Sequence, residues 1–272
     1  MQVDLNDKVV RAVVQEYTNA IVNYQSQIEL DFDVHKLIHT FQVVKTAEEL
    51  IKLTRPVLSE KVKKQIINAA ILHDIGRCHE FINGEKRKKF DHGQYGYALI
   101  KKYFPSLSVE GECTKLHNKQ PSPNDPSELF PILDYVRDAD MLGNIWYNAL
   151  NMPIFIRHIV GAWYPKLDRF LLDEEIRNAA KEKRPCVYSR IKHFDNLGIL
   201  VAQLLWLYNL KTKAAFRFAK KTDIFSKCRD AIITQALPMI KVSAAQRKKV
   251  ARDIETLFPD SLFKEEFKRH GI

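Results

Sequence analysis

Histidine and aspartate residues interrupt the apolar segments of this chain at separate places. His73 and Asp74 directly follow the apolar residues 69–72. His39 shares one helical stripe with the apolar residues four, eight and eleven positions further along, so its ring is expected to face inward. Taken alone, His39 fits a core histidine with a hydrogen-bond partner. Because burying an imidazole or a carboxylate costs free energy unless a partner offsets it, each of these residues needs a partner inside the fold.

Further positions show the same pattern. His92 stands at an expected helix start, and His117 lies where a helix runs into a proline-rich loop. Asp138 and Asp140 lie inside an apolar segment. Imidazole nitrogens and carboxylate oxygens are suitable ligands for Mn, Fe, Zn or Mg, and coordination offsets the cost of burying them. A shared divalent metal accounts for all of these positions together.

The adjacent residues His73 and Asp74 can share one centre only if the helix ends near them. Neighbouring residues on a helix point about 100° apart, which normally prevents joint coordination. Gly76 follows at once and predicts a helix end, which relaxes this limit. The carboxylate of Asp74 can then join its neighbour on one ion or bridge two ions.

Helices must position these residues, because apolar residues recur at helical spacing and no run alternates convincingly as a strand does. The spacing predicts helices over residues 33–53, from Ser59 as the cap to near Gly76, and over 92–103, 109–117, 128–150, 194–218 and 244–257. Three prolines predict a loop over residues 118–128. The sequence therefore predicts an all-α fold, with no internal repeat.

A change in composition indicates two parts of the chain, without a flexible linker between them. Its 272 residues, of which 46% are hydrophobic, suffice for a sizeable core. Near residues 151–153 a part rich in His and Asp gives way to a part rich in aromatic and basic residues. We expect a metal-binding helical core over residues 1–150 and a C-terminal helical extension over residues 151–272, packed on the core as one compact unit.

The composition also indicates where in the cell the protein is located and which types of metal ligand it uses. The segment MQVDLNDKVVRAVVQEY lacks the features of a signal peptide, and no apolar run nears the roughly 20 residues that span a bilayer. We expect a cytoplasmic protein without a membrane partner. The four cysteines lie far apart and form no C-x-x-C pair, which indicates reduced thiols rather than disulfides or a thiolate zinc site. Any metal is therefore expected to use nitrogen and oxygen ligands.

The formal net charge of +10 favours anionic partners. Basic residues cluster over residues 84–90 (GEKRKKF), 101–102, 211–221 and 246–252. Such clusters are more often solvated helix faces or loops than binding sites. Residues 84–90 stand out because they lie between the His73–Asp74 pair and His92. We expect this run to gather an anionic substrate.

The order of the histidines and aspartates resembles the HD-domain superfamily of metal-dependent phosphohydrolases. That family is named for a His…His-Asp…Asp set, which His39, His73–Asp74 and Asp140 match with separations of 34, 1 and 66 positions. The blocks ILHDIGR, DHGQYG, LHNKQPSP and RDADML follow in the order seen in a bacterial group usually described only as predicted phosphohydrolases. The resemblance covers residues 35–144, and it implies an HD-domain helical core.

The resemblance also implies a ligand set and leaves the number of ions open. Some members hold one divalent ion, and others hold a second ion through two additional histidines, with the Asp of the His-Asp pair as a bridge. We expect one or two ions of Mn, Fe, Mg or Zn. The implied ligands are His39, His73, Asp74 and Asp140 for the first ion, with His92 and His117 joining Asp74 at the second.

Two aspartates compete for the last ligand position. The A-D-x-L block of the family aligns with residues 139–142, so the resemblance gives the metal role to Asp140. Asp138 becomes a candidate for orienting a ligand histidine through a hydrogen bond. The chain departs from some relatives at Gly143, where an acidic residue often follows the leucine.

The implied activity is hydrolysis of a phosphoester by metal-activated water. The expected partner is a small phosphorylated substrate, with nucleotides among the candidates. We expect Asp74 and Arg77 to be catalytic. The C-terminal extension is expected to cover the active site or to support a homodimer. Basic residues near the ligand blocks are candidates for binding substrate phosphates: Arg77, Lys86, Arg87, Lys88, Lys89, Lys115 and Lys119.

Two other functions remain open at this point. Some two-metal members of the superfamily are di-iron oxygenases that use the same six ligands, so the ligand spacing does not exclude oxidation chemistry. The chain can also be a basic nucleic-acid-binding protein whose HD core is structural. Its support is an alternation of basic and aromatic residues that includes Trp206, Tyr208, Phe216 and Phe218. Because leucines surround those aromatic residues, a place in the core is the better interpretation, and nucleic acid is not the favoured partner.

Overall fold

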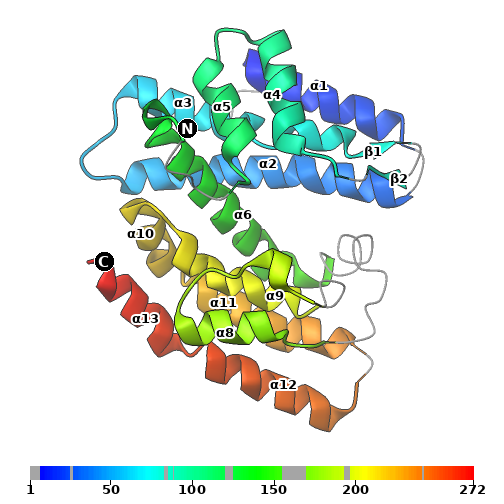
Figure 1. The fold of residues 1–272 in the computed structure, drawn as a ribbon, viewed down its shortest axis with the longest axis vertical. Coiled ribbons are helices and arrows are strands. Elements are labelled where there is room, and N and C mark those ends of the chain that lie inside the picture. Colours follow the sequence, from blue (N-terminus) through cyan, green and yellow to red (C-terminus); the bar gives the residue numbers. More distant parts are fainter. Residues whose placement is uncertain are drawn as a thin grey trace. The chain divides into compact units, whose positions relative to one another are not determined.

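The computed structural model is almost entirely helical, which confirms the predicted all-α fold (Figure 1). It describes residues 7–24, 27–82, 85–87, 89–119, 125–154, 170–192, 197–240 and 242–272. Contacts between residues divide the chain into two compact units, Met1–Gly143 and Asn144–Ile272. The predicted division at residue 150 falls inside a helix, and the packing of the two parts as one compact unit stays a prediction. No described helix combines the length and apolar character needed to cross a membrane.

In the described residues of the first unit, five helices and two short 3-10 turns occur, together with the first part of a sixth helix. Side chains cap three of the helices, because Asp7, Ser59 and Asp91 each accept a hydrogen bond from a backbone N–H group of the first turn. The elements are α1 (Lys8–Val22), α2 (Gln27–Leu53), α3 (Glu60–Leu72), η1 (Ile75–His79), α4 (His92–Tyr103), α5 (Ser108–Leu116), η2 (Ser127–Leu129) and α6 (Ile132–Ile154).

The helices of this unit pack pairwise around a buried core. Helix α2 lies against α1 and α3, and α4 lies against α5 (Figure 1). Helix α4 also lies against η1. Fully buried residues such as Phe32, Val43, Leu50, Ile66 and Leu72 fill the space between the helices. Each helix thereby presents one apolar face to the others, which stabilises the unit and fixes the helix ends that carry the polar residues.

A short hairpin joins η1 to α4 and was not predicted from the sequence. Its strands β1 (Phe81–Ile82) and β2 (Glu85–Lys86) pair antiparallel, with Phe81 opposite Lys86. Two residues a strand are too few to show an alternating pattern. The hairpin is continued by a hydrogen bond of 2.9 Å from the backbone N–H of Arg87 to the carbonyl oxygen of Glu80.

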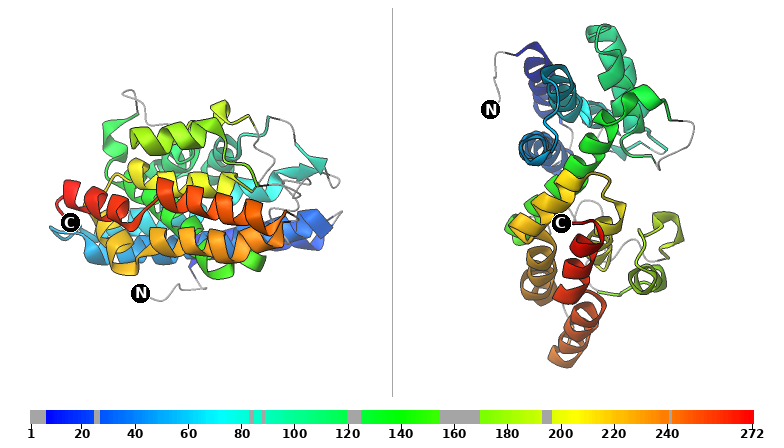
Figure 2. Two further views of the ribbon diagram at one scale, coloured as in Figure 1. Left: turned by 90° about the horizontal axis from the view of Figure 1, so that it is seen from below. Right: turned by 90° about the vertical axis from the view of Figure 1, so that its left-hand side faces the viewer.

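The second unit is helical as well, and it is viewed from two further sides in Figure 2. Several of its elements are short and lie in regions where the sequence predicted no separate helix. Its elements are α8 (Glu174–Glu182), η4 (Tyr188–Arg190), α9 (Ile199–Ala202), η5 (Gln203–Asn209), α10 (Lys213–Thr222), α11 (Ile224–Ala231), η6 (Ile232–Ala236), η7 (Leu237–Met239), α12 (Ala244–Leu257) and α13 (Asp260–Arg269).

The predicted single helix over residues 194–218 was wrong in its described part. The chain leaves the helical conformation at Leu210, which has φ −61° and ψ 140°, and Thr212 then caps α10 by accepting from the backbone N–H of Ala215. The apolar run ends at Leu210, and Thr212 follows as a helix cap, so these residues are the local signal for the break. Phe216 and Phe218 are buried, which removes them as stacking platforms for nucleic-acid bases.

Candidate metal centre

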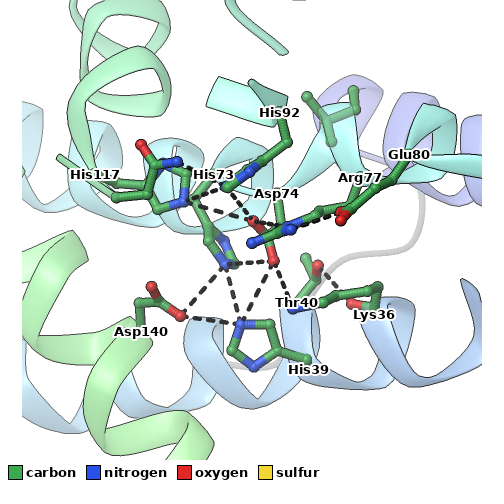
Figure 3. A network of polar contacts seen from close by, with 12 residues as sticks. Lys36, His39, Thr40, His73, Asp74, Arg77, Glu80, His92, His117 and Asp140 are labelled. Carbon is green, nitrogen blue, oxygen red and sulfur yellow. Dashed lines mark hydrogen bonds and ion pairs between the residues drawn. The ribbon is translucent and has the colours of Figure 1, made fainter. Parts of the chain in front are cut away.

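The histidines and aspartates singled out by the sequence come together in the first unit (Figure 3). All are buried except Asp140, whose side chain is 24% exposed. Each lies at or near the end of a helix or on an inward face, so the helix packing sets their separations. They are His39 on α2, His73 directly after α3, Asp74 at the start of η1, His92 at the start of α4, His117 directly after α5, and Asp140 on α6.

The end of α3 lets the adjacent residues His73 and Asp74 face one centre. His73 is still helical, with φ −53° and ψ −40°, whereas Asp74 has φ −107° and ψ 12°. The change in backbone conformation turns the carboxylate toward the imidazole, as the sequence predicted. Gly76 has a different role from the predicted one, because it lies inside η1. A Cβ atom there would lie 2.1 Å from the carbonyl oxygen of His92, so glycine allows η1 and α4 to approach closely.

Asp74 divides its two carboxylate oxygens between two pairs of histidines. Its Oδ2 atom lies 3.8 Å from Nε2 of His39 and 3.7 Å from Nε2 of His73. Its Oδ1 atom lies 3.3 Å from Nε2 of His92 and 3.5 Å from Nε2 of His117. These distances define two overlapping groups of three ligand atoms that share Asp74. The arrangement suits a carboxylate that bridges two ions.

Asp140 reaches the first of these groups. The Oδ1 atom of Asp140 lies 3.0 Å from Nε2 of His39 and 3.8 Å from Nε2 of His73. Burial would raise the pKa of Asp140, but the hydrogen bond with His39 holds that pKa below its usual value. Asp138 is fully buried on the same helix, and its role in orienting a histidine stays a prediction.

Backbone carbonyls orient two of the histidines. Nδ1 of His73 lies 2.8 Å from the carbonyl oxygen of Ala70, and Nδ1 of His117 lies 2.7 Å from that of Thr114. Because only a protonated nitrogen donates to a carbonyl, we assign the ring proton of each to Nδ1. The lone pair on Nε2 then faces the centre. Burial lowers the pKa of His73 to about 4, so this ring is neutral near pH 7 and ready to bind a metal.

The donor set fits divalent metal ions. The Nε2 atoms of His39 and His73 lie 3.2 Å apart, and those of His92 and His117 lie 3.3 Å apart. Facing nitrogens at such distances need a proton or a cation between them. Two ligands with bonds of about 2.0–2.2 Å to one tetrahedral ion lie roughly 3.3–3.6 Å apart, which is close to the separations in both groups. Imidazole and carboxylate donors accommodate Mn, Fe, Zn or Mg.

A comparison with protein families identifies this arrangement. Residues 37–144 match the family model described as HD domain. This part of the chain is an HD domain. The domain belongs to a superfamily of metal-dependent phosphohydrolases whose members bind divalent metals, and the match includes all six candidate ligands. Searches of curated proteins and of solved structures returned no significant match.

A buried lysine that the sequence did not indicate also lies beside the candidate metal ligands. Lys36 precedes the matched region, and its Nζ atom lies 3.2 Å from Oδ2 of Asp74 (Figure 3). Burial would raise the pKa of Asp74, but Lys36 is the strongest of the groups that hold it well below its usual range. The available signal was the position of Lys36 one helical turn before His39, on a face that is otherwise inward.

Arg77 lies beside the same carboxylate, as the sequence predicted for a residue of the site. Its Nε atom lies 3.4 Å from Oδ1 of Asp74, and its Nη1 atom donates to Glu80 over 2.6 Å. Glu80 is itself buried and thereby fixes the guanidinium plane. Lys36 and Arg77 thus approach Asp74 on its two different oxygens.

The other predicted phosphate-binding residues have different surroundings. Arg87 stacks on the ring of Phe90, 5.4 Å from its centroid. Lys115 pairs with Glu112 over 3.1 Å, and Lys119 pairs with Asp91 over 3.3 Å. Lys89 is exposed, whereas Lys88 and the side chain of Lys86 lie outside the described residues. These contacts involve residues outside the candidate ligand set, so the substrate-binding role of these basic residues stays a prediction.

Proposed function

We propose that the chain hydrolyses a phosphoester of a small anionic substrate, such as a nucleotide, at a centre of two divalent ions. The observation that carries this proposal is the position of Asp74, because each of its oxygens faces a separate pair of buried histidines. His39, His73, Asp74 and Asp140 would hold one ion, and Asp74, His92 and His117 the other. When bound, such ions supply the Lewis acidity that activates a water and neutralises phosphoryl oxygens.

The residues of the chain prepare the centre for an anionic substrate. Burial keeps His73 and His92 neutral, since it lowers their pKa values to about 4 and about 2. Asp74 stays ionised because Lys36 and Arg77 lie beside it. The ammonium and guanidinium groups also carry further N–H donors, which can bind phosphoryl oxygens. Glu80 orients Arg77 so that its planar donor group is preorganised for that contact.

The activity is tested with a panel of nucleotides, cyclic nucleotides and generic phosphoesters. Each substrate is assayed with Mn, Mg, Fe or Zn, with and without dioxygen, and release of phosphate or of a phosphomonoester is measured. We expect turnover without dioxygen in the wild type and its loss in Asp74→Asn. Asp230→Asn is the matched control, because Asp230 is exposed in the second unit. Activity that requires both iron and dioxygen, without phosphoester cleavage, would instead identify an oxygenase.

The number of ions is tested by replacing the second histidine pair. His92→Gln and His117→Gln are expected to lower the metal content from about two ions a chain to about one, because each variant removes a ligand of one group only. The content is measured by elemental analysis after loading and gel filtration. A content of one ion in both the wild type and the variants would favour a centre with a single metal.

A further inference from the structure

A second cluster of side chains that could bind a metal lies on η1 and α1. It is separate from the candidate metal centre of the HD domain, which we call the HD centre. Cys78 and His79 are consecutive residues of η1, and Glu16 reaches them from α1. One ligand atom from each of the three lies within 4.8 Å of the other two. None of these residues belongs to the ligand set of the HD centre. No sequence pattern indicated the cluster, because Glu16 lies on α1, far along the chain from Cys78 and His79.

The contacts within this cluster suit a metal ion. Nε2 of His79 lies 3.4 Å from Oε2 of Glu16, close to the roughly 3.3 Å that separates two ligands of one tetrahedral zinc ion with bonds near 2.0–2.1 Å. The side chains of His79 and Glu16 are 34% and 18% exposed, whereas Cys78 is buried. An ion can therefore enter from solvent and meet the thiol at the inner end of the site. The ring of Tyr95 lies 4.8 Å from that of His79 and limits its movement.

The electrostatic surroundings of Cys78 favour a cation. Burial raises the pKa of its thiol, and the negative charge of Glu16 raises it further. The thiol is therefore protonated without a metal, and its Sγ atom lies 2.9 Å from the carbonyl oxygen of Ile75. The carboxylate of Glu16 supplies a negative charge beside the thiol, which stabilises a divalent ion. A bound zinc ion removes the thiol proton, so the Zn–S bond replaces the S–H bond and the proton is released to solvent.

We propose that Glu16, Cys78 and His79 form a zinc site with a thiolate ligand, distinct from the nitrogen and oxygen centre of the HD domain. The soft thiolate selects zinc over Mn or Mg, which the HD centre accommodates. The bound ion ties α1 to the turn that begins at Asp74 and carries Arg77. The hydroxyl of Tyr17, the next residue on α1, donates to the carbonyl oxygen of Asp74 over 2.8 Å, so α1 contacts the same turn twice.

Cobalt provides the test, because a thiolate bound to Co²⁺ gives an intense near-ultraviolet charge-transfer band. The HD centre contains no sulfur ligand, so the band reports the Glu16–Cys78–His79 site alone. The full-length wild type, titrated with Co²⁺, is expected to develop the band, and added Zn²⁺ is expected to abolish it. Cys78→Ser should lack the band while still binding cobalt at the HD centre. Cys113→Ser, which changes another buried thiol of the first unit, should keep it.

Glu16→Gln keeps the thiol and removes one ligand from a half-buried position, so it tests the site even if Cys78→Ser does not fold. We expect it to weaken cobalt binding at the thiolate site at least tenfold. Absence of the band in the wild type after saturation of the HD centre would overturn the proposal. Loss of the band in Cys113→Ser, or an unchanged titration in Glu16→Gln, would overturn it as well. None of these measurements depends on hydrolase activity.

Discussion

Asp74 of the HD domain is contacted by two cationic side chains. Lys36 and Arg77 contact its two oxygens; Lys36 is buried, and the side chain of Arg77 is 19% exposed. A buried cation that loses its counterion keeps the cost of desolvation without the compensating attraction. Substitutions in this group therefore change metal binding, substrate binding and stability in different proportions, which allows the roles to be separated.

Lys36→Met is expected to weaken substrate binding without weakening metal binding. A charge-assisted hydrogen bond contributes about 1.5–3 kcal/mol, so loss of the ammonium group should raise KM by roughly 10- to 150-fold. Metal affinity should stay equal or increase, because a positive charge next to Asp74 is removed. KM is measured from initial rates, and metal affinity by titration calorimetry. Lys45→Met, an exposed position on the same helix, is the control, and an unchanged KM in Lys36→Met would contradict the assignment.

Asp33 makes the stability of the fold depend on pH, and the sign of this dependence is opposite to that of most carboxylates. Burial raises its pKa from 3.8 to about 7, and the nearby charges of Glu29 and Glu80 add to this. The folded state therefore binds the proton more tightly than the unfolded state between these values. The stability that Asp33 contributes is complete below pH 4 and is lost as the pH rises toward 7 and beyond.

The side chain in Asp33→Asn cannot ionise, so this variant should not lose stability in the same way as the pH rises. The unfolding free energy of the variant minus that of the wild type is expected to rise by about 1–2 kcal/mol between pH 4 and pH 7.5, after allowance for partial solvent screening. Urea denaturation of the metal-free protein at several pH values measures the difference. Asp230→Asn, at an exposed position, should show no comparable trend. A flat difference for Asp33→Asn would show that Asp33 ionises normally in the fold.

At the scale of elements, the helix bounds that depend on caps and on local apolar spacing were predicted from the sequence. The start of α3 at Ser59, the bounds of α4 and the bounds of α12 follow from caps and apolar spacing, and the structure confirms them. The two-residue strands of the hairpin are too short to show an alternating pattern, and Thr212 was not recognised as a cap within the predicted helix. The sequence placed the six ligands in order but missed the lysine beside them, because the contact between Lys36 and Asp74 joins residues distant in sequence. Long-range packing determines which ends of helices meet.

Gly76 shows how closely two of those elements must approach. A Cβ atom at this position would lie 2.1 Å from the carbonyl oxygen of His92 and 2.7 Å from the backbone nitrogen of Gly96. Both obstacles are backbone atoms of α4, so η1 and α4 can only move apart. That movement separates Asp74 from His92, whose ligand atoms are now 3.3 Å apart.

Gly76→Ala is therefore expected to weaken binding of the second ion at least tenfold and to lower the free energy of unfolding by about 1–3 kcal/mol. Binding of the first ion should change less, because none of its other ligands lies on α4. Metal titration and urea denaturation measure these effects. Gly111→Ala is the control, since its nearest obstacle is the half-buried side chain of Tyr97, 3.3 Å away. Equal effects of the two substitutions would rule out a specific role for the contact between η1 and α4.

At the scale of the whole molecule, each unit has its own buried core. Residues such as Val43 and Leu72 are fully buried in the first unit, and Leu204 and Phe225 are buried in the second. The HD match ends at residue 144, at the division between the units. All six candidate ligands lie in the first unit. A unit with its own core can unfold as one cooperative element, so a ligand that binds it stabilises that element first.

Metal binding is therefore expected to slow amide hydrogen exchange in the first unit more than in the second. At 100 times its Kd, one bound ion contributes about 2.7 kcal/mol, which corresponds to roughly 100-fold slower exchange for amides that exchange through opening of that unit. Mass spectrometry of peptides from α2, α3, α4 and α5 should show this slowing, and peptides from α12 and α13 should change little. Asp74→Asn is the control that should not respond. Equal slowing in α12 and α13 would show instead that the two units open together.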